Sequence, residues 1–83
     1  MTPEELFEQV IAILKPYTKA PEALAVAKME TSILADLKVN SARLVDVVLE
    51  IEDRFDIAIK DEEADGVRTI GDAVSLILAH APA

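Results

Sequence analysis

Apolar residues recur at helical spacing in three separate parts of the chain. In the first part, Thr2 and Glu5 form the S/T-x-x-E pattern of a helix start, with Pro3 in the first turn. Pro16 lacks an amide donor and disfavours helical geometry at Lys15, so the helix should end near Lys15. Between these limits, one face of the predicted helix carries Leu6, Val10, Ile13 and Leu14.

The second part has the strongest pattern in the chain. Its helix is predicted to begin at Asn40 or Ser41, both of which are good N-cap residues. We expect one apolar stripe of this helix to lie in the core, namely Leu44, Val47, Val48, Ile51 and Phe55. Val45 and Leu49 lie one turn apart on the flank of the stripe, so they form either the edge of the core or a small exposed patch.

The third part is the C-terminal region. Asp61 is predicted to cap a short helical turn that Gly66 closes, and Thr69 to cap the last helix. The apolar residues of the last helix follow helical spacing: Ile70, Ala73, Val74, Ile77 and Leu78. We expect this helix to fray over residues 80–83.

Residues 17–39 have a weaker period and contain Pro21, so they predict a long connection with at most a turn or two of helix in the Ala-rich piece. Five apolar residues of this connection are expected to anchor it: Leu24, Val26, Ile33, Leu34 and Leu37. The sequence therefore predicts a single all-α domain over residues 1–83. Its architecture should be a four-helix bundle with three major helices, one short helix and a long first loop.

Composition agrees with a small helical domain and adds a strong charge. Of the 83 residues, 52% are hydrophobic and 29% are charged, which argues against a disordered chain. Sixteen acidic residues outnumber eight basic ones, and the net charge of −8 repels nucleic acids and anionic lipids. The charge either steers the protein toward partners with Lys and Arg patches or only maintains solubility. With an acidic amphipathic start and no long apolar run, we expect a cytoplasmic monomer without membrane insertion.

Few residues of this chain could act as catalysts. It contains no cysteine, and its one histidine, His80, falls in the turn expected to fray. No G-x-S-x-G sequence surrounds Ser32, Ser41 or Ser75, so we do not predict an enzyme. The acidic run from Asp61 lacks the spacing of a calcium loop, and we predict no metal site.

Ser41 has a location that suits an attached phosphate. The amides and the dipole at a helix N-terminus favour a negative group, while the hydroxyl stays exposed. The alternative is that Ser41 merely caps the helix.

Four short segments share their joint spacing with a known family. They are "DL" at Asp36, "FDI" at Phe55, "DEE" at Asp61 and "TIGD" at Thr69. With them, residues 31–80 resemble an acyl carrier protein. The resemblance implies that Ser41 receives a 4′-phosphopantetheine arm from coenzyme A, attached by a separate phosphopantetheinyl transferase. The arm would carry acyl groups as thioesters for enzymes of a dedicated fatty-acid, lipid-modification or polyketide-like pathway.

The same resemblance implies two further sets of residues. The acyl chain would lie in a pocket lined by Leu44, Val48, Ile51, Ile59, Ile70 and Ala73. Enzymes with basic patches would bind the second major helix through Asn40, Ala42, Arg43, Val45, Asp46, Leu49, Glu52 and Asp53.

The chain departs from the family pattern around Ser41. Asn40 replaces an aspartate that in the family helps to hold the transferase's magnesium, Ala42 replaces a leucine, and Arg43 stands at a commonly acidic position. Lys38 replaces a usual glycine. These changes favour a specialised carrier with dedicated partners. The alternative is a degenerate homologue that acts unmodified as an acidic docking module.

Overall fold

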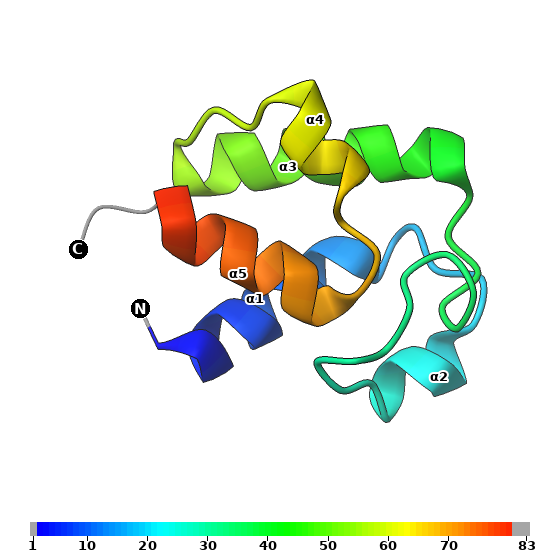
Figure 1. Ribbon diagram of the computed structural model, residues 1–83. Coiled ribbons are helices and arrows are strands. Elements are labelled where there is room, and N and C mark those ends of the chain that lie inside the picture. Colours follow the sequence, from blue (N-terminus) through cyan, green and yellow to red (C-terminus); the bar gives the residue numbers. More distant parts are fainter. Residues whose placement is uncertain (1, 81–83) are drawn as a thin grey trace.

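The computed structural model describes residues 2–80, in which all regular elements are helices. They are α1 (Pro3–Leu14), α2 (Pro21–Ala25), α3 (Ser41–Phe55), α4 (Asp61–Asp65) and α5 (Ile70–His80). The three long helices lie side by side, and α1 runs opposite to α3 and α5 (Figure 1). The predicted all-α bundle with three major helices is confirmed, and the long first loop contains α2 as one additional short helix. None of the described helices is long and apolar enough to cross a membrane.

Reciprocal hydrogen bonds start α1 as predicted. The amide of Glu5 donates to Thr2 Oγ1 at 3.2 Å, and the amide of Thr2 donates to Glu5 Oε1 at 3.0 Å. This arrangement satisfies two amides that a helix start otherwise leaves without partners. The helix ends at Leu14, one residue before the predicted limit.

The core lies between the apolar faces of α1, α3 and α5, and residues of the first loop complete it. Leu6, Val10, Ile13 and Leu14 are buried from α1, and Val47, Val48 and Ile51 from α3. Leu44 and Phe55 were also expected in the core but are only partly buried, because they lie near the two ends of α3. Leu78 is 43% exposed, since its neighbour Ile77 takes the inward position on α5.

The first loop is anchored by a partly different set of residues from the predicted one, because Val39 is buried without having been predicted. Leu24, Ile33 and Leu37 are buried, whereas Val26 and Leu34 are 74% and 42% exposed, so the prediction was wrong for these two. Backbone hydrogen bonds give the loop its other anchors. The amide of Ile33 donates to the Arg68 carbonyl at 3.0 Å, and the amide of Ile70 donates to the Thr31 carbonyl at 3.1 Å. The loop is thereby tied to the start of α5.

Helix α4 begins differently from the prediction. Asp61 is its first residue rather than its cap, and the amide of Lys60 donates to Glu63 Oε1 at 3.1 Å. Gly66 ends the helix at φ −83°, an ordinary right-handed conformation. None of the residues of α4 is buried, so its position depends on its flanks and on polar contacts.

Helix α5 begins as predicted but ends differently. The amide of Asp72 donates to Thr69 Oγ1 at 3.0 Å, and Asp72 Oδ2 accepts from the amides of Thr69 and Arg68, both at 3.1 Å. These backbone donors, Thr69 first, lower the pKa of the Asp72 carboxyl. At the other end, His80 is the last residue of the helix and not part of a frayed turn, because its ring contacts Glu63. Residues 81–83 of the predicted frayed segment lie outside the described residues.

Gly71 permits a close approach between α5 and the first loop. Its amide donates to the Met29 carbonyl at 2.7 Å, and an added Cβ would lie only 2.9 Å from that oxygen. We therefore expect Gly71→Ala to lower the free energy of unfolding by about 1–2 kcal/mol, despite the better helix propensity of alanine. Urea denaturation followed by circular dichroism measures this loss. Gly66→Ala is the matched control, because its Cβ would lie 3.5 Å from the nearest atom, and it should be neutral or stabilising. Equal midpoints for the two variants would contradict the close approach.

Lys38 adopts a backbone conformation that favours glycine. Its φ is 57°, in the left-handed region, where a side chain costs about 1–2 kcal/mol. We expect Lys38→Gly to stabilise the protein by about 1 kcal/mol, with part of the relief lost to the greater freedom of glycine in the unfolded chain. Lys38→Ala removes the charge but keeps the strain, so it should give no comparable gain. Urea denaturation compares the free energies of unfolding of the two variants. An equal increase in Lys38→Ala would mean that loss of the lysine charge, and not relief of backbone strain, stabilises the protein.

Candidate functional site

Asn40, and not Ser41, caps the start of α3. Asn40 has extended backbone geometry, and its Oδ1 accepts a hydrogen bond from the amide of Ala42 at 2.8 Å. Ser41 is the first residue of the helix and is exposed. The side-chain hydrogen bonds found among residues 2–80 do not involve the Ser41 hydroxyl. The alternative that Ser41 serves as the cap is therefore wrong, and its hydroxyl is accessible at the positive end of the helix.

Ser41 stands at the rim of an open hollow of about 650 Å³. We call it the Ser41 hollow; α3, α4 and the segments on either side of α4 form its walls. Three residues of the predicted acyl pocket line it: Leu44, Val48 and Ile59. Its remaining lining residues are Leu34, Val45, Leu49, Glu52, Asp61, Ala64, Asp65, Val67 and Arg68. The hollow therefore combines apolar walls with a partly charged rim directly beside the hydroxyl.

The other three residues predicted for the acyl pocket lie elsewhere. Ile51, Ile70 and Ala73 are 3%, 0% and 2% exposed, and they belong to the closed core rather than to the lining of the hollow. They pack with α1, which the sequence pattern alone does not show. A role for them in sheltering an acyl chain stays a prediction, because it requires the hollow to extend into the core.

Several lining residues were not predicted. Leu34 comes from the first loop, and Ala64, Val67 and Arg68 come from α4 and the segment after it. No local pattern marks these residues, since their position depends on how the chain folds back across α3. Leu34 was predicted to anchor the first loop, and its exposure in the structure distinguishes it from the buried residues of that loop.

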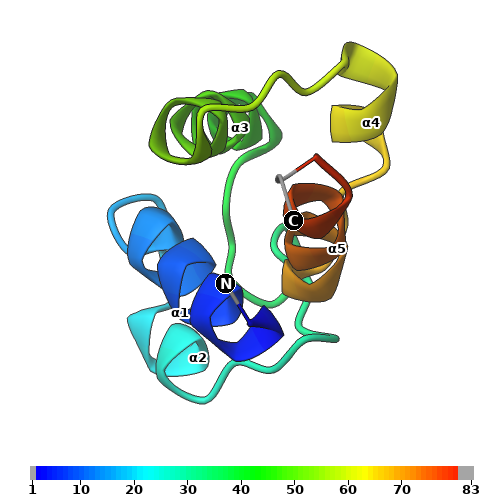
Figure 2. The same ribbon diagram turned by 90° about the vertical axis from the view of Figure 1, so that its left-hand side faces the viewer.

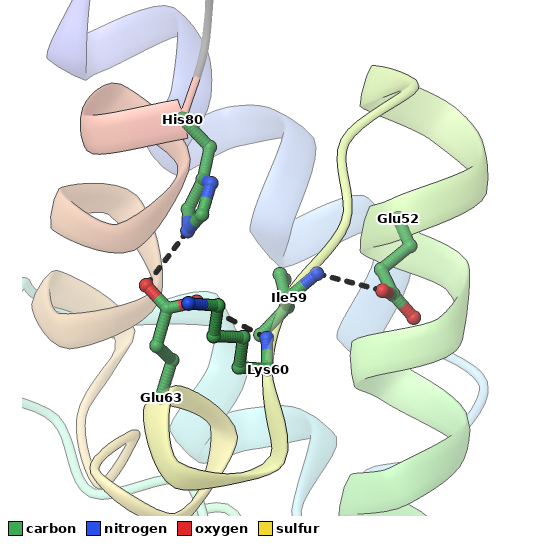
Figure 3. Close-up of polar contacts among 5 residues, drawn as sticks. All are labelled: Glu52, Ile59, Lys60, Glu63 and His80. Carbon is green, nitrogen blue, oxygen red and sulfur yellow. Dashed lines mark hydrogen bonds and ion pairs between the residues drawn. The ribbon is translucent and has the colours of Figure 1, made fainter.

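The residues predicted to contact partners are divided between two sides of Ser41. Val45 and Leu49 are 60% and 56% exposed, so the pair is an exposed patch, and both residues line the Ser41 hollow. Glu52 also lines it, but its Oε2 accepts a hydrogen bond from the amide of Ile59 at 2.7 Å (Figure 3). Glu52 thus fixes the segment between α3 and α4 in addition to any contact with a partner. Asp53 is exposed and lines neither hollow.

A second open hollow, of about 810 Å³, lies on the other side of the α3 start. Four of the predicted partner residues line it, namely Asn40, Ala42, Arg43 and Asp46, together with Pro16, Tyr17, Thr18 and Lys19 of the first loop. Arg43 Nη1 lies 3.2 Å from Asp46 Oδ2, and both side chains remain largely exposed. Asp46 therefore offsets part of the positive charge that Arg43 adds beside Ser41.

The arrangement does not resemble that of a serine hydrolase. His80 Nε2 lies 2.7 Å from Glu63 Oε2, at the end of α5. The start of α3, with Ser41, lies at the opposite end of the bundle from the end of α5 (Figure 1). The histidine consequently has no route to activate this hydroxyl. The geometry instead suits modification of Ser41 by another protein.

Comparison with known proteins identifies a matching family. A family model described as a phosphopantetheine attachment site matches residues 8–77. An acyl carrier protein of Prochlorococcus marinus is 36% identical over 79 residues, which cover 95% of this chain and 96% of that protein. An acyl carrier protein of Clostridium acetobutylicum is 43% identical over 53 residues, 64% of this chain and 69% of its relative. The structure of an acyl carrier protein from Enterococcus faecalis, described for its high thermal stability, superposes with a TM-score of 0.79 at 31% identity. The superposition covers 98% of this chain and 100% of the other.

Proposed function

Because this chain belongs to the acyl carrier protein family, and is a carrier rather than an enzyme, we propose that Ser41 bears its 4′-phosphopantetheine arm. Residues 1–83 would then form a single carrier domain. The observation that supports Ser41 most directly is its position as the exposed first residue of α3, beside a hollow with apolar walls. Because Asn40 supplies the cap, attachment at Ser41 leaves the start of the helix intact.

Elementary electrostatics favours a phosphodiester at this position. The amides of the first turn and the helix dipole stabilise negative charge at the N-terminus of α3. This compensation matters in a protein with a net charge of −8, which otherwise repels a further anion. The arm supplies the thiol that the chain itself lacks, and acyl groups are held on that thiol as thioesters.

The Ser41 hollow is the proposed shelter for the acyl chain. Leu44, Val48 and Ile59 offer it apolar walls, and transfer of methylene groups from water onto such walls is favourable. Longer chains would reach the buried residues behind them, Ile51, Ile70 and Ala73, after the bundle widens. The cargo would therefore be an alkyl or polyketide-like chain rather than a polar group.

The partner surface is proposed to combine a small apolar contact with long-range charge. Val45 and Leu49 provide the contact, and Asp46, Glu52 and Asp53 attract basic enzymes. A small apolar area limits affinity, so the carrier leaves each enzyme quickly. Since Asn40, Ala42 and Arg43 alter the surface around Ser41, we assign the protein to a dedicated fatty-acid, lipid-modification or polyketide-like pathway with its own transferase and acyl-transferring enzymes.

The attachment site can be tested by intact-mass spectrometry of the protein isolated from its native host. We expect the mass of one phosphopantetheine group on the wild-type chain and none on Ser41→Ala. Ser75→Ala is the matched control, because Ser75 is also exposed on a long helix. This variant should be fully modified at Ser41. A wild-type protein that stays unmodified in every growth condition would favour the unmodified docking module instead.

The effect of the altered residue before Ser41 can be tested with a general phosphopantetheinyl transferase. Asn40→Asp keeps a good N-cap and adds a negative charge near the site of the transferase's magnesium, so the initial rate of modification should rise roughly tenfold. Asn40→Ser is the control, since serine also caps but carries no charge, and it should react like the wild type. Mass spectrometry over time gives the rates. If Asp and Ser variants react equally, the charge at this position does not limit modification.

A further inference from the structure

Helix α4 is a wall of the Ser41 hollow that has no buried side chain of its own. Asp61, Ala64 and Asp65 share one helical face, by their i, i+3 and i+4 spacing, and this face lines the hollow. A helix of five residues without core contacts is not stable by itself in water. The contacts that hold α4 in place therefore determine the shape of the hollow.

The chain on either side of α4 is firmly anchored. Before it, the amide of Ile59 donates to Glu52 Oε2 of α3 at 2.7 Å. After it, Val67 is 7% exposed, and the Arg68 carbonyl accepts from the amide of Ile33 at 3.0 Å. Among residues 2–80, the hydrogen bonds of the intervening segment 60–66 stay within that segment or its flanks, with one exception.

The exception is the contact between Glu63 and His80, which joins α4 to the end of α5 (Figure 3). Glu63 uses both carboxylate oxygens: Oε1 accepts from the amide of Lys60 at 3.1 Å, and Oε2 lies 2.7 Å from His80 Nε2. The Glu63 and His80 side chains are 31% and 27% exposed, so solvent reaches the contact only in part. The amide of Lys60 and then the ring of His80 lower the pKa of the Glu63 carboxyl, which keeps it an acceptor.

We propose that Glu63 and His80 are positioning residues that hold α4 against α5 and thereby set which acyl chains the Ser41 hollow accepts. This rests on the proposed function of the hollow as a shelter for the cargo. Neither residue lines the hollow: Glu63 lies outside the α4 face formed by Asp61, Ala64 and Asp65, and His80 lies on α5. Their contact fixes the wall and leaves its chemistry unchanged.

The location of the pair has a direct consequence for specificity. With the contact formed, α4 stays close to α3 and α5, and the hollow admits the length of chain that its present walls can cover. When the contact breaks, segment 60–66 can move about its anchored flanks, and a longer chain can then be covered. The pair thus favours shorter cargo, and its loss favours longer cargo.

The wild-type protein and three variants test this proposal. His80→Ala removes the contact, and His80→Gln keeps a nitrogen donor that can reach Glu63. Leu78→Ala is the control for truncation of a side chain at an exposed position in the same turn of α5.

Hydrogen exchange is first measured on the unmodified protein at the amides of Ala64 and Val67, which donate to the Lys60 and Ala64 carbonyls. These amides should exchange roughly three- to tenfold faster in His80→Ala than in the wild type, with core amides of α1 as the reference. His80→Gln should restore most of the protection, and Leu78→Ala should leave it unchanged.

The second measurement concerns the cargo. Each protein is loaded by a general transferase from acyl-coenzyme A donors of increasing chain length, and cleavage of the thioester by hydroxylamine is timed. For the longest acyl chains, we expect the thioester to be cleaved at least roughly three times more slowly in His80→Ala than in the wild type. For the shortest chains, the two proteins should react at equal rates. A merely structural role would change the cleavage rates for all chain lengths alike.

The outcomes separate this inference from the function on which it rests. Unchanged exchange at Ala64 and Val67 in a folded His80→Ala protein overturns the positioning role. Faster exchange with an unchanged dependence on chain length overturns the role in cargo choice. A third outcome is that hydrogen exchange differs as expected but no acyl-phosphopantetheine can be attached to any of the proteins. In that case the contact holds α4, and the proposed function fails.

Discussion

The structure depends on the backbone junction between the first loop and the start of α5. Here Ile33 and Ile70 donate to the carbonyls of Arg68 and Thr31, and Gly71 donates to Met29 at 2.7 Å. Buried hydrogen bonds of this kind are costly to leave unmade, so the two segments are fixed relative to one another. From the first-loop side of the junction, the chain continues through Leu34 and Lys38 to the start of α3. From the α5 side, it leads back to α4. The same contacts therefore locate the start of α3, where Ser41 lies, and the end of α4, and both helices line the hollow. These two helices lie at the top of the view in Figure 2.

The acidic character of the chain is partly structural. Within residues 2–80, five of the acidic residues accept hydrogen bonds from backbone amides: Glu5, Asp36, Glu52, Glu63 and Asp72. Three of them lie in first turns of helices, where amides lack partners and the helix dipole favours negative charge. Partner recognition and solubility are therefore not the only uses of this charge. Of the other acidic residues, Asp46, Glu50 and Asp53 lie on α3 with the exposed apolar pair Val45 and Leu49, and three more lie on α4.

The sequence allowed the long helices, most of their caps and most core residues to be predicted, because each depends on local spacing. Predictions failed where position depends on distant parts of the chain. Leu34 was expected to anchor the first loop because it is apolar, yet it is exposed and lies at the hollow, since the loop turns at Lys38 before α3 begins. His80 was expected to fray because it is near the terminus, and only the return of α4 toward α5 gives it a partner. The family resemblance led to Ser41 as the proposed attachment residue, while local capping rules alone did not decide whether Asn40 or Ser41 caps α3.

A carrier of this kind must meet two opposing requirements. Its bundle has to be stable with 83 residues and no disulfide, but the proposed shelter would have to admit and release a chain of methylene groups. The structure separates the two tasks. Within the described residues, eleven of the seventeen buried apolar residues lie on α1, α3 and α5, five more come from the first loop with α2, and α4 supplies none. Displacing α4 therefore exposes little apolar surface and breaks few hydrogen bonds, so the hollow can change shape at a small cost in free energy while the core stays closed.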